Sequence, residues 1–176
     1  RSFVAVVPLG GRHVNHLWRL LRGLEIPFAT LLDHDVGRSG GGWGRIKTAY
    51  DQLIATGTQS GQVAPAGWQG PFLLMLASLD PKKKMEAEAQ WLASLRTHGV
   101  FFCTPLDLDM SMLNALPDEY RALDPSMKGP STVGEAMTAV LGKDGNPNAY
   151  VAKKWDDAFH WYRYLFLGRG KPTTHM

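Results

Sequence analysis

A short apolar run that ends in two carboxylates constrains the fold more than any other stretch. Residues 28–32 are followed by Asp33 and Asp35, and then by a loop rich in glycine. Buried strands of α/β proteins are near-continuous hydrophobic runs, and ligands collect at their carboxyl ends. A charged side chain cannot lie inside such a strand without a partner. We therefore expect Asp33 and Asp35 to stand at the open end of a buried strand.

Two carboxylates this close repel each other unless a cation or a proton lies between them. A divalent metal ion with oxygen ligands is the simplest solution. The alternative is a turn in which Asp33 caps the backbone and Asp35 is solvated, because aspartate is a common turn residue. Toprim nucleases, haloacid-dehalogenase-like phosphatases and nucleotide-sugar glycosyltransferases all place such a pair of acids at a strand end.

Composition limits the class of protein without deciding the function. A chain of 176 residues can form one domain with a core, or one core with a helical insertion. Its net charge of +3 permits a nucleic-acid partner without demanding one. The single cysteine, Cys103, excludes an internal disulfide framework and fits a reducing compartment, so we expect a cytoplasmic protein. No apolar stretch approaches the roughly 20 residues that span a bilayer.

The first 32 residues predict a βαβ unit. Residues 3–9 are a β-rich apolar run, and residues 14–24 carry apolar side chains at helical spacing up to a stop at Gly23. With the strand over residues 27–32 they form a unit whose strands are parallel almost by rule. We expect a parallel sheet that is at least partly covered on both faces. Because the chain enters directly into a strand, we interpret it as a fragment.

Further helices follow from spacing and capping patterns. Residues 56–70 predict a loop, and residues 72–76 are ambiguous between strand and helix. Thr132, with Glu135 three residues later, has the pattern of a capping box. Helices are expected over 45–55, from Pro81, from Thr132 and over 152–167. The helix from Pro81 would have Met85, Ala89, Leu92 and Leu95 on one face. The helix over 152–167 would place Trp155, Phe159, Tyr162 and Phe166 in the core.

A second apolar strand also runs into acids. Residues 99–103 are followed by Pro105, Asp107 and Asp109. Two strand ends with carboxylates in one small domain are expected if the acids converge on shared cations. The alternative makes Asp109 the N-cap of a helix over 110–116, a role that would still leave one carboxylate oxygen free.

Basic residues could hold phosphate groups near these acids. The glycine-rich loop over residues 37–45 can approach a phosphate or a metal ion closely. Arg38 and Arg45 flank it and suit a phosphodiester backbone, although a surface turn with solvated arginines is equally compatible. Lys171, between Gly170 and Pro172, could stabilise a transition-state phosphate, or could be a solvated terminal lysine.

Together these stretches resemble the C-terminal Toprim domain of OLD (overcoming lysogenisation defect) nucleases, in the class 2 branch. The resemblance covers nearly the whole chain. It implies a Toprim-like α/β fold, with a mostly parallel sheet flanked by helices, in one catalytic domain over 1–176. A helical insertion or peripheral layer would occupy roughly 56–98 and 117–150. The matching stretches are 6–11, 26–35, 40–46, 100–102 with 105–109, and 165–172.

The resemblance implies a metal-dependent endonuclease that nicks and cuts DNA by two-metal catalysis with Mg²⁺ or Mn²⁺. It also implies an ABC-type ATPase domain upstream in the same polypeptide. The family's metal-site glutamate has no counterpart before Phe3, so full activity is not expected from this stretch alone. The implied roles are Toprim acids for Asp33 and Asp35, a further acid at Asp109 with Asp107 nearby, a catalytic lysine at Lys171, and a loop near the metals at Ser39 and Gly41.

Three other functions stay open. A non-catalytic DNA-binding or interaction module would have an incomplete metal site. A phosphatase would use Asp33 as nucleophile and Asp35 as acid and base, but it usually has threonine or valine where this chain has Gly37. A glycosyltransferase would hold a sugar nucleotide through a metal ion and would leave Lys171 unexplained. We expect DNA as a partner and no membrane, and a homodimer is compatible with the sequence.

Overall fold

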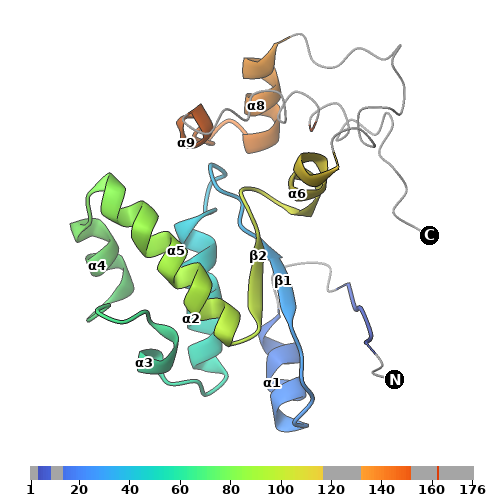
Figure 1. The fold of residues 1–176 in the computed structure, drawn as a ribbon, viewed down its shortest axis with the longest axis vertical. Helices are drawn as coiled ribbons and strands as arrows, with labels where there is room; N and C mark the ends of the chain where they lie inside the picture. Colours follow the sequence, from blue (N-terminus) through green and yellow to red (C-terminus); the bar gives the residue numbers. More distant parts are fainter. Residues whose placement is uncertain (1–3, 9–13, 117–131, 152–161, 163–176) are drawn as a thin grey trace. The chain divides into compact units, whose positions relative to one another are not determined.

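The computed structural model describes residues 4–8, 14–116, 132–151 and 162, and it mixes helices with a small parallel sheet (Figure 1). By their contacts, the described residues fall into a first unit within 1–30 and 48–100 and a second unit within 31–47 and 101–176. The elements are α1 (Asn15–Gly23), β1 (Thr30–Asp33), α2 (Trp43–Ala55), α3 (Ser60–Val63), α4 (Phe72–Ser78), α5 (Pro81–Thr97), β2 (Val100–Cys103), α6 (Leu108–Ala115), α8 (Val133–Leu141) and α9 (Asn148–Val151).

Aromatic side chains form much of the core of the first unit. Trp18 of α1 is fully buried, and its indole nitrogen donates a hydrogen bond to the Thr30 hydroxyl at 2.9 Å. Trp91 of α5 is also fully buried and meets the ring of Tyr50 edge-on, with the ring centroids 5.2 Å apart. Phe72, the first residue of α4, lies against Trp91 with centroids 4.9 Å apart. Residues 72–76, ambiguous in the sequence, belong to this helix, and Phe72 is its buried residue.

The α5 helix begins as expected but buries a different face. It starts at Pro81, with the Asp80 carboxylate accepting a hydrogen bond from the Lys83 backbone at 2.9 Å. Its buried residues are Ala87, Trp91 and Leu95, whereas Met85 is 68% exposed. The predicted face of Met85, Ala89, Leu92 and Leu95 is therefore wrong except at Leu95. Positions 87, 91 and 95 recur every fourth residue, so burying the large Trp91 ring selects this face.

The predicted first strand is absent from the described part of the chain. Residues 4–8 have no regular secondary structure, and the side chains of Val4 and Val6 are 86% and 91% exposed. A β-rich run becomes a strand only when a neighbouring strand accepts its backbone hydrogen bonds, and in the described residues β1 and β2 pair with each other. The βαβ prediction is thus wrong here. Leu31 is 56% exposed, so one face of β1 is covered only in part.

Other predictions from local patterns are confirmed. The α1 and α2 helices cover the expected stretches, and α1 ends at Gly23. Thr132 caps α8, because its hydroxyl accepts the Glu135 backbone N–H at 3.1 Å. The loop predicted over residues 56–70 is interrupted by the short α3 helix.

The second unit has its own core around α6, α8 and α9. This core includes one residue of the predicted C-terminal helix, Tyr162, which is buried as the aromatic stripe indicated. The buried members of this core are Leu106, Met110, Leu113, Met137, Val140, Leu141, Tyr150 and Tyr162.

Among the described helices, none has the length and apolar character needed to cross a membrane.

Candidate functional site

The segments that follow β1 and β2 stay paired beyond the strands. The backbone N–H of His34 donates to the carbonyl of Cys103 at 3.2 Å, and that of Asp35 donates to the carbonyl of Leu106 at 2.7 Å. Parallel strands bring their carboxyl ends to one edge of a sheet. The acids that follow the two strands therefore lie in one place, within the second unit.

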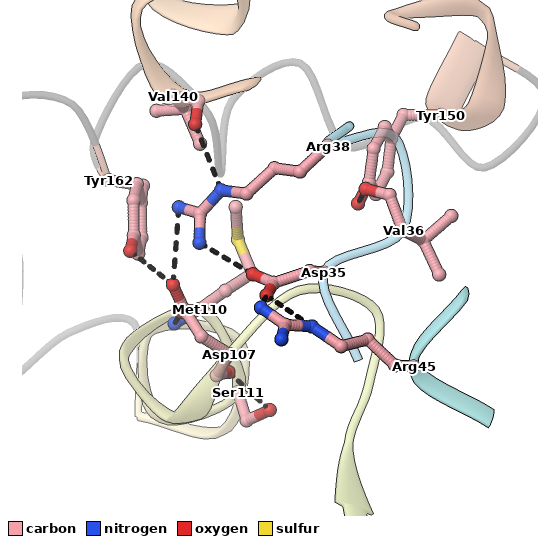
Figure 2. A network of polar contacts seen from close by, with 10 residues as sticks. All are labelled: Asp35, Val36, Arg38, Arg45, Asp107, Met110, Ser111, Val140, Tyr150 and Tyr162. Carbon is pink, nitrogen blue, oxygen red and sulfur yellow. Dashed lines mark hydrogen bonds and ion pairs between the residues drawn. The ribbon is translucent and has the colours of Figure 1, made fainter. Parts of the chain in front are cut away.

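Asp35 is buried between two arginines (Figure 2). The Arg38 Nη1 atom lies 2.6 Å from one carboxylate oxygen of Asp35, and Arg45 Nε donates to the other at 3.0 Å. Arg45 Nη2 contacts that same oxygen. Only 3% of Asp35 is exposed, so its charge is compensated by guanidinium groups rather than by water. Arg38 and Arg45, predicted to hold a DNA backbone, are thus both engaged with Asp35.

The glycine-rich loop makes this double contact possible. The backbone N–H of Arg38 donates to the Asp35 carbonyl at 3.0 Å, and that of Gly41 donates to the Arg38 carbonyl at 2.9 Å. A Cβ atom on Gly41 would lie 1.8 Å from the Asp35 carbonyl oxygen, so no other residue fits at position 41 without a shift of the backbone. Ser39 is exposed in the same loop. Position 41 therefore requires glycine for the close approach of two backbone segments.

Gly37 brings the same loop against α9. Its φ angle is +86°, and a Cβ atom there would lie 2.8 Å from the Tyr150 ring. The carbonyl of Gly37 accepts the Asn146 backbone N–H at 2.7 Å, and the Tyr150 hydroxyl donates to the carbonyl of Val36. The loop that carries Arg38 is therefore fixed by contacts within the second unit.

Asp107 is the N-cap of α6 and the second centre of the polar network. Its Oδ1 accepts the Met110 backbone N–H at 3.0 Å, and its Oδ2 lies 3.5 Å from Arg38 Nη2 and accepts the Tyr162 hydroxyl (Figure 2). The alternative in which Asp109 is the N-cap of this helix is wrong, because Asp109 lies in the first turn of α6. Capping at Asp107 starts the helix two residues earlier, which places Met110 and Leu113 in the core.

Arg38 links the two carboxylates. Its Nε donates to the Val140 carbonyl at 3.1 Å, while its two terminal nitrogens face Asp35 and Asp107. Burial acts to lower the pKa of the Arg38 guanidinium, but the charge of Asp35 and other contacts raise it above its ordinary value. Burial also raises the pKa of the Tyr162 hydroxyl, together with its hydrogen bond to Asp107. Both groups therefore keep their protons at neutral pH.

Asp33, the last residue of β1, has a different environment from Asp35. It is only partly exposed, and no ion pair joins it to a described residue. Partial burial, followed by the negative charges of Asp107 and Asp35, raises the pKa of the Asp33 carboxyl, although a Leu108 backbone hydrogen bond acts to lower it. The same acids, Asp33 and Asp107, add to burial in raising the pKa of the Cys103 thiol. The described neighbours of Asp33 therefore compensate its negative charge less than Arg38 and Arg45 compensate that of Asp35.

The donor atoms suit Mg²⁺ or Mn²⁺ in kind but not in arrangement. Oxygen ligands from carboxylates are what these ions prefer. Within the described ranges, however, no group of three or more His, Cys, Asp or Glu side chains is placed to hold a metal ion. The oxygens of Asp35 and Asp107 already face arginine, tyrosine and backbone groups. Lys171 lies outside the described residues.

Two residues beside the acids, Tyr162 and His34, have contacts that no pattern in the sequence predicts. Tyr162 follows Asp107 by 55 positions, and no local pattern links the two residues. His34, between the two acids, is 1% exposed and packs against Phe102 with ring centroids 5.5 Å apart. The aromatic stripe predicted the burial of Tyr162 but not its polar contact.

Comparisons with known families, with curated proteins and with solved structures find no match to this chain.

Proposed function

We propose that this chain is the nuclease part of an ATPase–nuclease protein, a metal-dependent DNA endonuclease with a Toprim-like fold. The observation that carries the proposal is the gathering of Asp33, Asp35 and Asp107 at the ends of two parallel strands. Partial burial, followed by the charges of Asp107 and Asp35, raises the pKa of Asp33, so the folded chain keeps a partly buried carboxyl beside like charges at a cost in stability. Such perturbed groups concentrate at functional sites.

The arginines support a phosphodiester as the substrate class. Arg38 and Arg45 place two guanidinium groups within reach of these carboxylates, with side chains that remain 28% and 21% exposed. Guanidinium groups match the geometry of phosphate oxygens and do not lose their charge. A phosphodiester beside Asp33 would therefore lie near a carboxylate that can bind a cation and near two guanidinium groups that can bind phosphate oxygens. The described carboxylates form no ready metal site.

A second candidate is a DNA-binding or interaction module without catalysis. The ion pairs of Asp35 favour it, because both oxygens of that carboxylate are occupied. In this case Asp35 would orient the arginines, and Asp33 would be a residue whose raised pKa has no chemical use. DNA binding would then depend on salt in the manner of phosphate contacts, with or without divalent ions.

A plasmid assay separates the two candidates. Supercoiled plasmid would be incubated with the wild-type polypeptide, including the upstream segment that the resemblance implies, and Mg²⁺ or Mn²⁺, with EDTA as the metal-free control. Asp33→Asn removes the central carboxylate, and Asp144→Asn removes an exposed carboxylate elsewhere in the second unit. The nuclease predicts nicking that requires metal, survives Asp144→Asn and is lost in Asp33→Asn. DNA binding without nicking by the wild-type chain would favour the module.

A further inference from the structure

Both oxygens of the buried Asp35 carboxylate are occupied by guanidinium groups. One oxygen lies 2.6 Å from Arg38 Nη1, and the other accepts Arg45 Nε–H at 3.0 Å and contacts Arg45 Nη2. The backbone of Asp35 has a φ angle of +55°, a left-handed conformation that aspartate and asparagine adopt more readily than most residues. The Asp-x-Asp pattern predicts an open ligand at position 35, whereas the structure shows a carboxylate that two side chains already use.

The two arginines differ in how many of their nitrogens are engaged. Arg38 uses all three, because Nε donates to the Val140 carbonyl and the two terminal nitrogens face Asp35 and Asp107. Among the described residues, the side chain of Arg45 makes polar contacts with Asp35 alone, through Nε and Nη2. Its third nitrogen, Nη1, points away from Asp35 (Figure 2). Arg45 therefore keeps the two N–H donors of Nη1 for a further acceptor.

The contact with Asp35 prepares Arg45 to bind an anion. A free arginine side chain has many rotamers, and ordering it on binding costs conformational entropy. Asp35 has already fixed the guanidinium of Arg45, while 21% of the side chain remains exposed. An acceptor at Nη1 would thus gain a charged hydrogen bond without ordering the side chain first. Phosphate oxygens match guanidinium donors in geometry and charge, which points to a phosphodiester as that acceptor.

We propose that Asp35 is a positioning residue, which orients Arg45 so that Nη1 donates to a phosphodiester oxygen of DNA, and that it is not a cation ligand. Arg38 holds the other carboxylate oxygen and is the structural member of the pair. This inference rests on the proposed function, because it takes DNA as the partner of the same site. It also explains, without a bound ion, why the carboxylate at position 35 faces arginines.

Binding of a short fluorescein-labelled DNA duplex in EDTA, followed by fluorescence anisotropy, tests the role of Asp35 by the sign of the effect. Asp35→Asn removes a negative charge, so on charge alone the affinity for DNA would rise. The proposal predicts a fall of about three- to tenfold, because the amide no longer holds the guanidinium of Arg45 for its phosphate contact. Asp144→Asn, at an exposed position, is the control and should not weaken binding. An Asp35→Asn protein that binds DNA as tightly as wild type, or more tightly, would overturn the proposal.

A double-mutant cycle tests whether Asp35 acts through Arg45. Arg45→Gln removes the phosphate contact, so the affinity should fall and the slope of its logarithm against that of the salt concentration should become shallower by about one. In the Arg45→Gln background, Asp35→Asn should cause no further fall. Equal losses in both backgrounds would show that Asp35 acts independently of Arg45 and would contradict positioning.

Arg45→Lys covers the case in which Asp35→Asn fails to fold. Lysine keeps the charge that pairs with Asp35, but its single ammonium group has no second edge to present to a phosphate. The affinity of Arg45→Lys for the duplex should therefore be close to that of Arg45→Gln. Wild-type affinity in Arg45→Lys would overturn the proposal, and so would a wild-type protein that does not bind the duplex in EDTA.

Failure of the proposed function has a different signature from failure of this inference. If no plasmid were nicked but Asp35→Asn still weakened DNA binding, the nuclease would fail and the positioning role would stand. If plasmid were nicked but Asp35→Asn bound DNA more tightly than wild type, the positioning role alone would fail.

Discussion

Asp107 lies close enough to Asp33 that its charge raises the pKa of the Asp33 carboxyl. The two residues come from the ends of different strands, so the fold rather than the local sequence brings them together. Asp107 is stabilised by Met110, Tyr162 and Arg38, whereas Asp33 receives a much smaller share of positive charge. Partial burial is the largest cause of the raised pKa of Asp33, and the charge of Asp107 is the second.

We expect Asp33→Asn to stabilise the fold at pH 7. The folded state binds the Asp33 proton more tightly than the unfolded state does, since the folded pKa lies above the ordinary value of 3.8. The ionised carboxyl then destabilises the fold once the pH exceeds that value, and fully so above the folded pKa. The gain should be a few tenths of a kcal/mol to about 1 kcal/mol, the range for partly exposed charges.

Urea unfolding, followed by tryptophan fluorescence, measures this gain. The difference between Asp33→Asn and wild type should shrink as the pH falls towards the ordinary pKa of aspartate. Asp144→Asn, a substitution at an exposed position, serves as the control and should change the free energy of unfolding little. A difference that grows at low pH would contradict the assigned repulsion.

Asp107 combines a capping role with an electrostatic role, and two substitutions separate them. Asp107→Ala removes the cap of α6 and the acceptor for Tyr162, so we expect a loss of about 1–3 kcal/mol in the free energy of unfolding. Asp107→Asn keeps a capping oxygen and should lose less. Both variants remove the charge and should lower the pKa of Asp33, which side-chain NMR titration measures.

Thr132→Ala is the matched cap removal on α8. It should cost about 1 kcal/mol and leave the pKa of Asp33 unchanged. An Asp33 pKa that stays constant in Asp107→Asn would show that the two carboxylates do not interact.

Two glycines of the same segment should respond in opposite ways to alanine. Gly41→Ala places a Cβ atom against the Asp35 carbonyl oxygen, so the loop must open and we expect a loss of about 2 kcal/mol or more. Gly44→Ala in α2 meets no atom within 4 Å and should be neutral or stabilising by up to about 1 kcal/mol. Thermal unfolding of both variants gives the comparison. Similar effects at the two positions would contradict the close approach at Gly41.

Local patterns predicted the helices well because spacing and caps depend on neighbouring residues. Thr132 lies at the start of α8, where its hydroxyl accepts a hydrogen bond from Glu135 three positions later, and α1 ends at Gly23. Residues 4–8 show the limit of such patterns, because a strand exists only with a partner strand and the sequence does not name the partner. The α5 face shows another limit. A count of apolar residues does not weigh the size of Trp91 against that of Met85.

The site was predictable only in outline. Apolar runs before Asp33 and Asp35 and before Asp107 and Asp109 predicted that acids from two strand ends would lie near one another. The resemblance gave the further acid as Asp109 with Asp107 nearby, whereas Asp107 is the residue that caps α6 and faces Arg38. The sequence could not show whether arginine or a cation compensates Asp35, since that depends on a loop closed by Gly41 and on a backbone φ of +55° at Asp35. Nor could it link Tyr162 to Asp107.

Mn²⁺ binding at pH 7, followed by electron paramagnetic resonance, tests whether the gathered carboxylates form a cation site around Asp33. Wild type and Asp144→Asn should bind the ion with the same affinity, and Asp33→Asn should bind it about tenfold more weakly or worse. An Asp33→Asn protein that binds Mn²⁺ as tightly as wild type would contradict the metal-dependent function proposed for this chain.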